Sequence, residues 1–112
     1  MIHIIRTRAT GQQMEEMLET LGTYIKLAVD VQQGILAGGG VLHADCEAVL
    51  LEAGSQQQDV WGADWNPAAR EVTFESLINI RPRQNNLSLE ILDSAIRGRV
   101  TEIVQQWLRG DA

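Results

Sequence analysis

The stretch YIKLAVDVQQGILA, residues 24–37, decides the fold of this chain. Over residues 24–31 apolar side chains alternate with others, as they do when one face of a β-strand packs against a core. The apolar members of this alternation are Ile25, Leu27, Val29 and Val31. Residues 32–34, Gln-Gln-Gly, are typical of a tight turn, in which the glycine supplies a positive φ. Because residues 35–37 are apolar again, the sequence predicts a β-hairpin.

The segment before the hairpin predicts a strand followed by a helix. Residues 2–6 are mostly apolar and β-branched, which favours a short strand. Thr10, followed three residues later by Gln13, forms a capping-box pattern at a helix start. The apolar residues that then recur at helical spacing are Met14, Met17, Leu18 and Leu21. Gly22 marks the expected end of this helix.

Three glycines at residues 38–40 break the second strand, and the segment after them has two interpretations. Residues 43–53, HADCEAVLLEA, are rich in strong helix formers and are followed directly by a glycine, so we expect a helix. The alternative is a strand that continues from the glycines. In that strand His43, Asp45 and Glu47 would share one face of the sheet.

Two more strands and a final helix complete the pattern. Residues 60–65 predict a strand, residues 66–70 a turn, and residues 72–80 a second strand with alternating side chains. Together they predict another hairpin, which Pro82 ends because proline cannot donate to the ladder. Asp93 is then in position to cap a helix. Its apolar residues are Ile96, Val100, Ile103, Val104, Trp107 and Leu108.

The order strand, helix, two strands, helix, two strands, helix predicts an α+β fold. We expect a mostly antiparallel sheet of four to five strands, with three helices packed against one side of it. The chain of 112 residues suits a single domain, residues 1–112, without repeats or linkers. Because a small open sheet has unpaired edges, we also expect a homodimer.

Composition and charge exclude several classes of protein. Apolar residues make up 45% of the chain and charged residues 21%, which are ordinary values for a globular domain. The net charge of −6 argues against nucleic-acid binding, which requires a basic face. A single cysteine excludes an internal disulfide. Because no apolar run approaches the roughly 18 residues of a membrane span, and no signal peptide begins the chain, we expect a cytoplasmic protein without membrane contact.

His43, Asp45 and Glu47 are the first candidate site. On a helix, His43 and Glu47 lie one turn apart on the same face, while Asp45 points elsewhere. A divalent metal or an acid–base mechanism would use the first two, but a metal needs a further ligand. The nearest acidic residues, Asp59 and Asp64, have no diagnostic spacing. The alternative is that the two carboxylates cap the helix and complement its dipole, so we predict no metal and no cofactor.

The polar run at residues 79–86 is the second candidate site. Its members are Asn79, Arg81, Arg83, Gln84, Asn85 and Asn86. They present many hydrogen-bond donors, and the arginine fork suits a carboxylate or a phosphate. The alternative is a solvated loop on a rigid sheet. Because the two dense polar runs carry opposite charges, we predict that one of the arginines pairs with Asp45 or Glu47.

Three other features have structural interpretations. Trp61 and Trp65 lie on one strand face, and we expect them in the core or in an interface. Cys46 stands between two acidic residues and near apolar ones, which favours a buried, unreactive thiol. The glycines at residues 38–40 lack a phosphate-loop pattern and are followed by acidic residues, so we expect a turn or bulge there.

Three stretches of the chain resemble a family of short, single-domain bacterial proteins of unknown function. The stretches are residues 26–55, residues 59–65 and residues 76–86. Their marks are GG at 38–39 followed by LHAD at 42–45, WG at 61–62, NIRP at 79–82 and NN at 85–86. The resemblance implies no activity, cofactor or partner.

We therefore predict a non-enzymatic binding or assembly module, with a polar site formed by residues 43–47 and 81–86. Its partner would be a protein or a small molecule. The alternative is a small metal-assisted or acid–base hydrolase that uses His43, Asp45 and Glu47.

Overall fold

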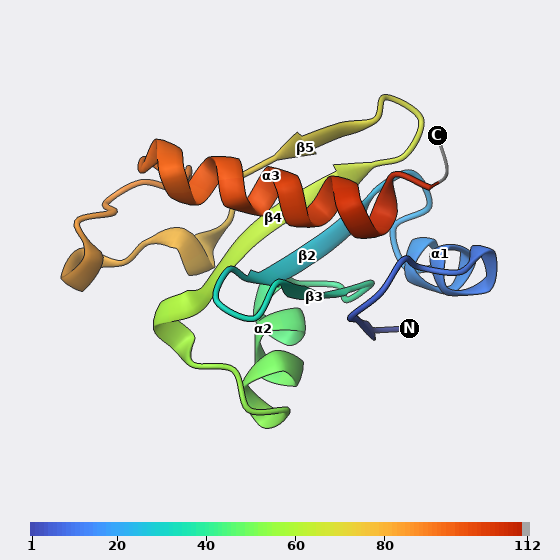
Figure 1. Ribbon diagram of the computed structural model, residues 1–112, viewed down its shortest axis with the longest axis horizontal. Helices are drawn as coiled ribbons and strands as arrows, with labels where there is room; N and C mark the ends of the chain where they lie inside the picture. Colours follow the sequence, from blue (N-terminus) through green and yellow to red (C-terminus); the bar gives the residue numbers. More distant parts are fainter. Residues whose placement is uncertain (111–112) are drawn as a thin grey trace.

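The hairpin of residues 24–37 forms the centre of a five-stranded antiparallel sheet in a computed structural model, which describes residues 1–110 (Figure 1). The strands are β1 (His3–Ile5), β2 (Ile25–Asp30), β3 (Ile35–Gly38), β4 (Val60–Asn66) and β5 (Glu71–Thr73). The helices are α1 (Gly11–Leu18), α2 (His43–Glu52) and α3 (Ser94–Leu108). Short 3₁₀ helices lie at Gln57–Asp59, Leu77–Asn79 and Pro82–Gln84. Across the sheet the order is β1-β3-β2-β4-β5, and the predicted α+β fold and order of elements are confirmed.

The predicted hairpin has the register that its alternation requires. Asp30 lies opposite Ile35 at the turn end of the β2–β3 pair. The turn contains Gly34, whose φ of +71° lies in the left-handed region that favours glycine. The fully buried apolar side chains of β2 on one face are Ile25, Leu27 and Val29. This buried face defines the register, because a slip by one residue would turn all three side chains to the other face.

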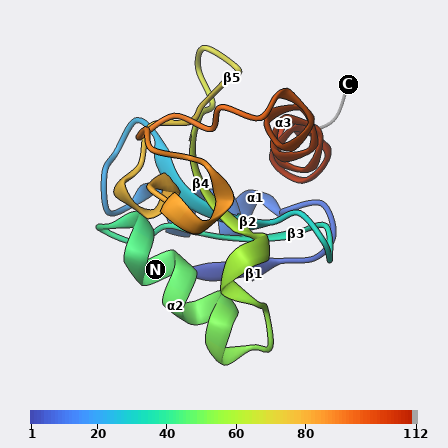
Figure 2. The ribbon, with the colours of Figure 1, turned by 90° about the vertical axis from the view of Figure 1, so that its left-hand side faces the viewer.

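Helices cover both faces of the sheet, so the prediction that all three pack against one side is wrong. Figure 2 shows α2 and α3 on opposite sides of the strands. The core on the α3 side includes Ile25, Leu27, Leu36, Trp61, Trp65, Val100 and Ile103. The core on the α2 side includes Ala28, Ile35, Ala37, Cys46, Leu50 and Val60. The alternation assigned Ala28 to the open face of β2, yet a side chain this small allows a helix to pack closely over the strand.

The capping patterns and the middle helix are confirmed. The side chain of Thr10 accepts from the backbone N–H of Gln13 at 3.1 Å, and the side chain of Gln13 accepts from the N–H of Thr10 at 2.9 Å. Asp93 accepts from the first turn of α3 at 2.8 Å. The segment after the glycines is the helix His43–Glu52, so the strand alternative is wrong.

The strand predicted over residues 72–80 ends at Thr73, and the prediction is wrong beyond that point. The side chain of Asn79 takes the place of a strand partner for β4. Its Oδ1 accepts from the N–H of Gly62 at 2.8 Å, and its Nδ2 donates to the carbonyl of Gly62 at 3.1 Å. An asparagine amide matches a peptide group, so the chain can leave the sheet without exposing the ladder. Pro82 consequently begins a 3₁₀ helix rather than ending a strand.

Gly62 leaves room for the segment that turns away from the sheet. A Cβ at Gly62 would lie 2.5 Å from Oγ of Ser76 and 2.9 Å from Cγ1 of Ile78. We expect Gly62→Ala to lower the free energy of unfolding by about 1–3 kcal/mol in urea denaturation. The matched control is Gly98→Ala on α3, where a Cβ meets nothing within 4 Å. There alanine should raise stability by about 0.5–1 kcal/mol, and equal effects at the two glycines would contradict this account.

The outer parts of the fold bear on membrane contact and on association. Within residues 1–110, every helix is too short or too polar to cross a membrane. The sheet edges are β1 and β5, which have three residues each. The homodimer expected from open edges stays a prediction.

Candidate functional site

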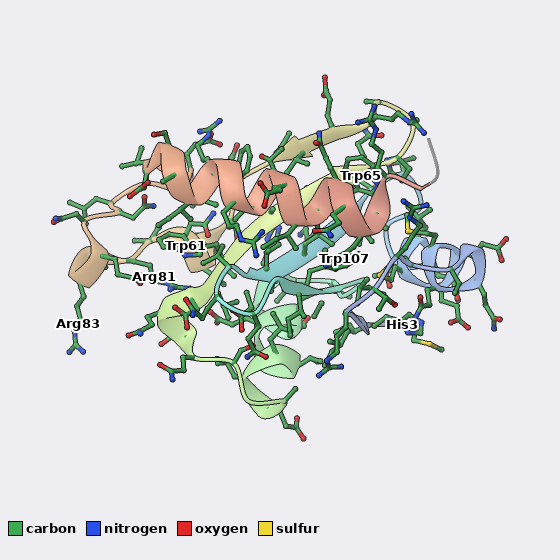
Figure 3. The ribbon with its side chains drawn as sticks, in the orientation of Figure 1. His3, Trp61, Trp65, Arg81, Arg83 and Trp107 are labelled. Carbon is green, nitrogen blue, oxygen red and sulfur yellow. The ribbon has the colours of Figure 1, made fainter. Side chains whose placement is uncertain are left out.

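Arg81 and Glu47 meet, as the opposite charges of their two segments predict. Nη2 of Arg81 lies 3.2 Å from Oε2 of Glu47, and the two side chains are 11% and 12% exposed. The guanidinium carbon lies 5.2 Å from the centre of the Trp61 ring. Figure 3 shows Arg81 next to Trp61, whereas Arg83 extends away from the body of the protein. The ion pair therefore joins α2 to the segment that follows the 3₁₀ helix Leu77–Asn79.

The guanidinium of Arg81 makes five hydrogen bonds, which matches the number of its N–H groups. The acceptors are the carbonyls of Ile78 (2.7 Å), Gln57 (2.9 Å) and Val60 (2.6 Å), Oε1 of Gln84 (3.1 Å) and Oε2 of Glu47 (3.2 Å). These acceptors come from several segments that are far apart in the sequence. Arg81 thus holds the segments together and has no donor left for a ligand.

Burial dominates the electrostatics of this ion pair. Burial raises the pKa of Glu47, while the charge of Arg81 and a hydrogen bond from Gln57 act in the opposite direction. Burial also lowers the pKa of Arg81, and the charge of Glu47 opposes that change. Both groups lose hydration, so their mutual attraction mainly offsets the cost of burying each charge. The ion pair therefore connects two segments of the fold. Loss of either partner would leave the other charge buried without an opposite charge.

Asn79 and Asn86 are buried and hydrogen-bonded to the backbone. Besides Gly62, Asn79 bonds the carbonyls of two residues through Nδ2, at distances of 2.7 Å to Phe74 and 3.0 Å to Leu89. Nδ2 of Asn86 donates to the carbonyls of Asn79 (2.7 Å), Ser88 (3.1 Å) and Glu90 (2.8 Å). Its Oδ1 accepts from the N–H of Leu92 at 2.9 Å. Both amides hold the loop of residues 74–92 in shape.

The remaining polar candidates are divided between a cap and an exposed loop. Oδ2 of Asp45 accepts from the N–H of Leu42 at 3.2 Å, so Asp45 caps α2. Arg83, Gln84 and Asn85 are exposed. Arg83 has no ion-pair partner within residues 1–110. It lines a polar cavity of about 680 Å³ together with Gln56, Gln57, Gln58, Ile80 and Gln84.

His43 pairs with Asp64, a residue whose spacing in the sequence is not diagnostic. Nε2 of His43 lies 2.8 Å from Oδ1 of Asp64 and 3.1 Å from the carbonyl of Ala63. Both partners are acceptors, so Nε2 carries a proton and Nδ1 is the acceptor in a neutral ring. Nδ1 has no hydrogen-bond partner within residues 1–110 and is not shut off from solvent. Thr73 donates to the other oxygen of Asp64 at 3.4 Å.

A cavity of about 660 Å³, which we call the His43 cavity, lies where α2 begins on the sheet. Its floor includes one row across three strands, because Lys26 is opposite Asp64, and Asp64 is opposite Thr73. Its apolar lining includes Leu42, Leu77 and Leu89. The loop that Asn79 and Asn86 hold supplies one side of this cavity. The sequence offered Asp64 only as a nearby acidic residue without diagnostic spacing, and it did not indicate Lys26. Only a helix packed over this face of the sheet brings the two residues to His43.

The residues of the predicted hydrolase do not converge. His43 bonds Asp64, Asp45 caps a backbone N–H, and Glu47 bonds Arg81. Within residues 1–110 no three metal-ligating side chains form a cluster. Cys46 is fully buried, and burial raises the pKa of its thiol to about 11, which disfavours the nucleophilic thiolate.

Comparison with known proteins gives a family match that covers most of the chain. Residues 3–107 match the model of a family described as protein of unknown function (DUF5674). Neither the curated proteins nor the solved structures contain a significant match.

Proposed function

This chain belongs to the DUF5674 family of proteins of unknown function, and we propose that it is a non-enzymatic binding module that holds a small molecule in the His43 cavity. The observation that carries this proposal is the free Nδ1 of His43. Most of the other buried polar candidates already bond the protein itself. Nε2 of His43 bonds Asp64 and the carbonyl of Ala63, whereas Nδ1 has no hydrogen-bond partner among residues 1–110.

The shape and chemistry of the His43 cavity support a small-molecule ligand. Its volume of about 660 Å³ falls within the range of about 300–1,000 Å³ that is usual for such sites. Apolar side chains line it together with a few polar groups, which is the usual pattern of ligand cavities. Leu77 is 77% exposed and Leu42 is 54% exposed, so both offer apolar surface to a ligand.

The segments 43–47 and 81–86 then have different roles in this module. Residues 43–47 supply His43, which contacts the ligand, and the cap that begins α2. Arg81 and Asn86 support the loop that borders the cavity. Direct ligand binding by the 81–86 segment stays a prediction, for which Arg83 and Gln84 have the suitable positions at the polar cavity.

The hydrolase alternative has less support from the arrangement of side chains. The predicted hydrolase needs His43, Asp45 and Glu47 to face one substrate, yet each of these side chains bonds a different group of the protein. The bonds of His43 go to Asp64 and Ala63, and Cys46 is buried with its thiol directed to the carbonyl of Lys26 at 3.4 Å.

An NMR titration with 3-methylbutan-1-ol, an uncharged amphiphile, tests the proposed function. We expect saturable amide shifts confined to residues 24–26, 42–44 and 73–78, since the hydroxyl can donate to Nδ1. His43→Ala should weaken binding at least five-fold. His3→Ala is the matched control, because His3 also pairs with a carboxylate, Glu16, at 2.8 Å. Shifts that do not saturate, or equal losses in the two variants, would overturn the proposal.

A further inference from the structure

Two opposite charges line the His43 cavity without partners. Lys26, the only lysine of the chain, and Glu75 both lie at this cavity. Within residues 1–110 neither side chain forms an ion pair, with the other or with a third residue. The remaining carboxylates at the cavity are engaged, because Asp64 bonds His43 and Glu90 lies 3.3 Å from Arg97. Among the residues that the structure describes, the cavity therefore presents one cation, Lys26, and one anion, Glu75, without an ion-pair partner.

These free groups define what a ligand must carry. Nδ1 of His43 and the carboxylate of Glu75 accept hydrogen bonds, so they match an ammonium group. The ammonium of Lys26 donates, so it matches a carboxylate. Leu42 and Leu77 line the same cavity, and their exposed surfaces match an aliphatic chain. A ligand with a single charge would leave one of the two free charges near apolar surface and without a partner.

We infer that the His43 cavity binds a small zwitterion with an aliphatic body, the chemistry of an apolar α-amino acid. This inference rests on the proposed function and adds the class of ligand. The ligand ammonium contacts Glu75 and Nδ1 of His43, and its carboxylate contacts Lys26. Its aliphatic chain packs on Leu42 and Leu77.

NMR titration of the full chain with four probes tests the inference. The probes have similar branched aliphatic bodies and differ in their charged groups. They are leucine, 3-methylbutylamine, 4-methylpentanoate and 3-methylbutan-1-ol. We expect leucine to bind at least ten-fold more tightly than the amine or the acid. The side-chain signals of Lys26 should shift with leucine and with the acid, and they are unambiguous because the chain has one lysine.

Three variants test the contributions of Lys26 and Glu75 to binding one at a time. Lys26→Met should remove the advantage of leucine over the amine, and Glu75→Gln should remove its advantage over the acid. Glu71→Gln is the control, because Glu71 is exposed on β5 and does not line the cavity. Glu75 is exposed, so its variant should keep the unfolding midpoint of the parent protein.

The outcomes distinguish this inference from the function on which it rests. If the amine or the acid binds as tightly as leucine, or if Glu71→Gln weakens leucine as much as Glu75→Gln, the inference is wrong. In that case saturable binding of the alcohol would still support a binding module. If none of the four probes shifts the cavity residues, both the inference and the proposed function are wrong.

Discussion

Replacing Arg81 with methionine is expected to lower the free energy of unfolding by about 3–5 kcal/mol, as measured by urea denaturation. Methionine keeps much of the side-chain volume but removes five hydrogen bonds. It also leaves Glu47 buried without its opposite charge. Arg83→Met is the matched control. Because the side chain of Arg83 is exposed, this variant should change the free energy of unfolding by no more than about 0.5 kcal/mol.

The effect of Arg81→Met should also depend on pH. Burial raises the pKa of Glu47 above its usual 4.5, and loss of Arg81 removes a charge that counteracts this rise. A carboxyl with a raised pKa in the folded state binds its proton more tightly there than in the unfolded chain. Folding is therefore favoured at low pH, and this contribution is lost as pH rises above 4.5 and through the folded-state pKa.

Unfolding of the variant at pH 4 and pH 7 measures this dependence. Relative to the parent protein, Arg81→Met should lose less stability at pH 4 than at pH 7. Adding Glu47→Gln to the variant should make the stability losses at pH 4 and pH 7 equal, because glutamine does not titrate. A loss below about 1 kcal/mol at pH 7 would mean that Arg81 does not hold the segments together.

Replacing Asn79 with alanine is expected to lower the free energy of unfolding by about 4 kcal/mol or more, because four hydrogen bonds to the backbone are lost, three of them buried. The N–H of Gly62 and the carbonyls of Gly62 and Phe74 would lose this partner inside the protein, and each such group costs about 1–3 kcal/mol. The carbonyl of Leu89 would still accept from the N–H of Ser76 at 3.1 Å. Asn79→Asp should be no better, since a carboxylate accepts but cannot donate to the three carbonyls.

Asn85→Gly is the control for Asn79. Asn85 is exposed and has a φ of +58°, a conformation that glycine adopts readily. The free energy of unfolding of Asn85→Gly should therefore stay within about 0.5 kcal/mol of the parent value. Hydrogen exchange gives a second measurement, because the amide of Gly62 should lose protection in Asn79→Ala. An unfolding midpoint for Asn79→Ala equal to that of Asn85→Gly would contradict the strand-replacing role of Asn79.

The sequence by itself determined most of the local elements and the meeting of two oppositely charged segments. Period-two alternation specified the β2–β3 hairpin, and the Thr10 and Asp93 caps specified two helix starts, because these signals depend on neighbouring residues. Charge predicted that an arginine of the later polar segment pairs with Asp45 or Glu47, since only two segments are densely polar and they differ in sign. The structure selected Arg81 and Glu47.

Only the tertiary structure decided which face each helix covers and which polar groups remain free. The α2 face was not predicted, because small residues such as Ala28 are compatible with either solvent or a packed helix. The strand over residues 72–80 ended early because the distant Asn79 side chain replaced it in the ladder. Residue type defines how many hydrogen bonds a side chain can form, but only the packed chain decides whether backbone or a ligand receives them. For that reason the sequence singled out His43, Asn79 and Arg81, whereas only the structure singled out Lys26 and Glu75.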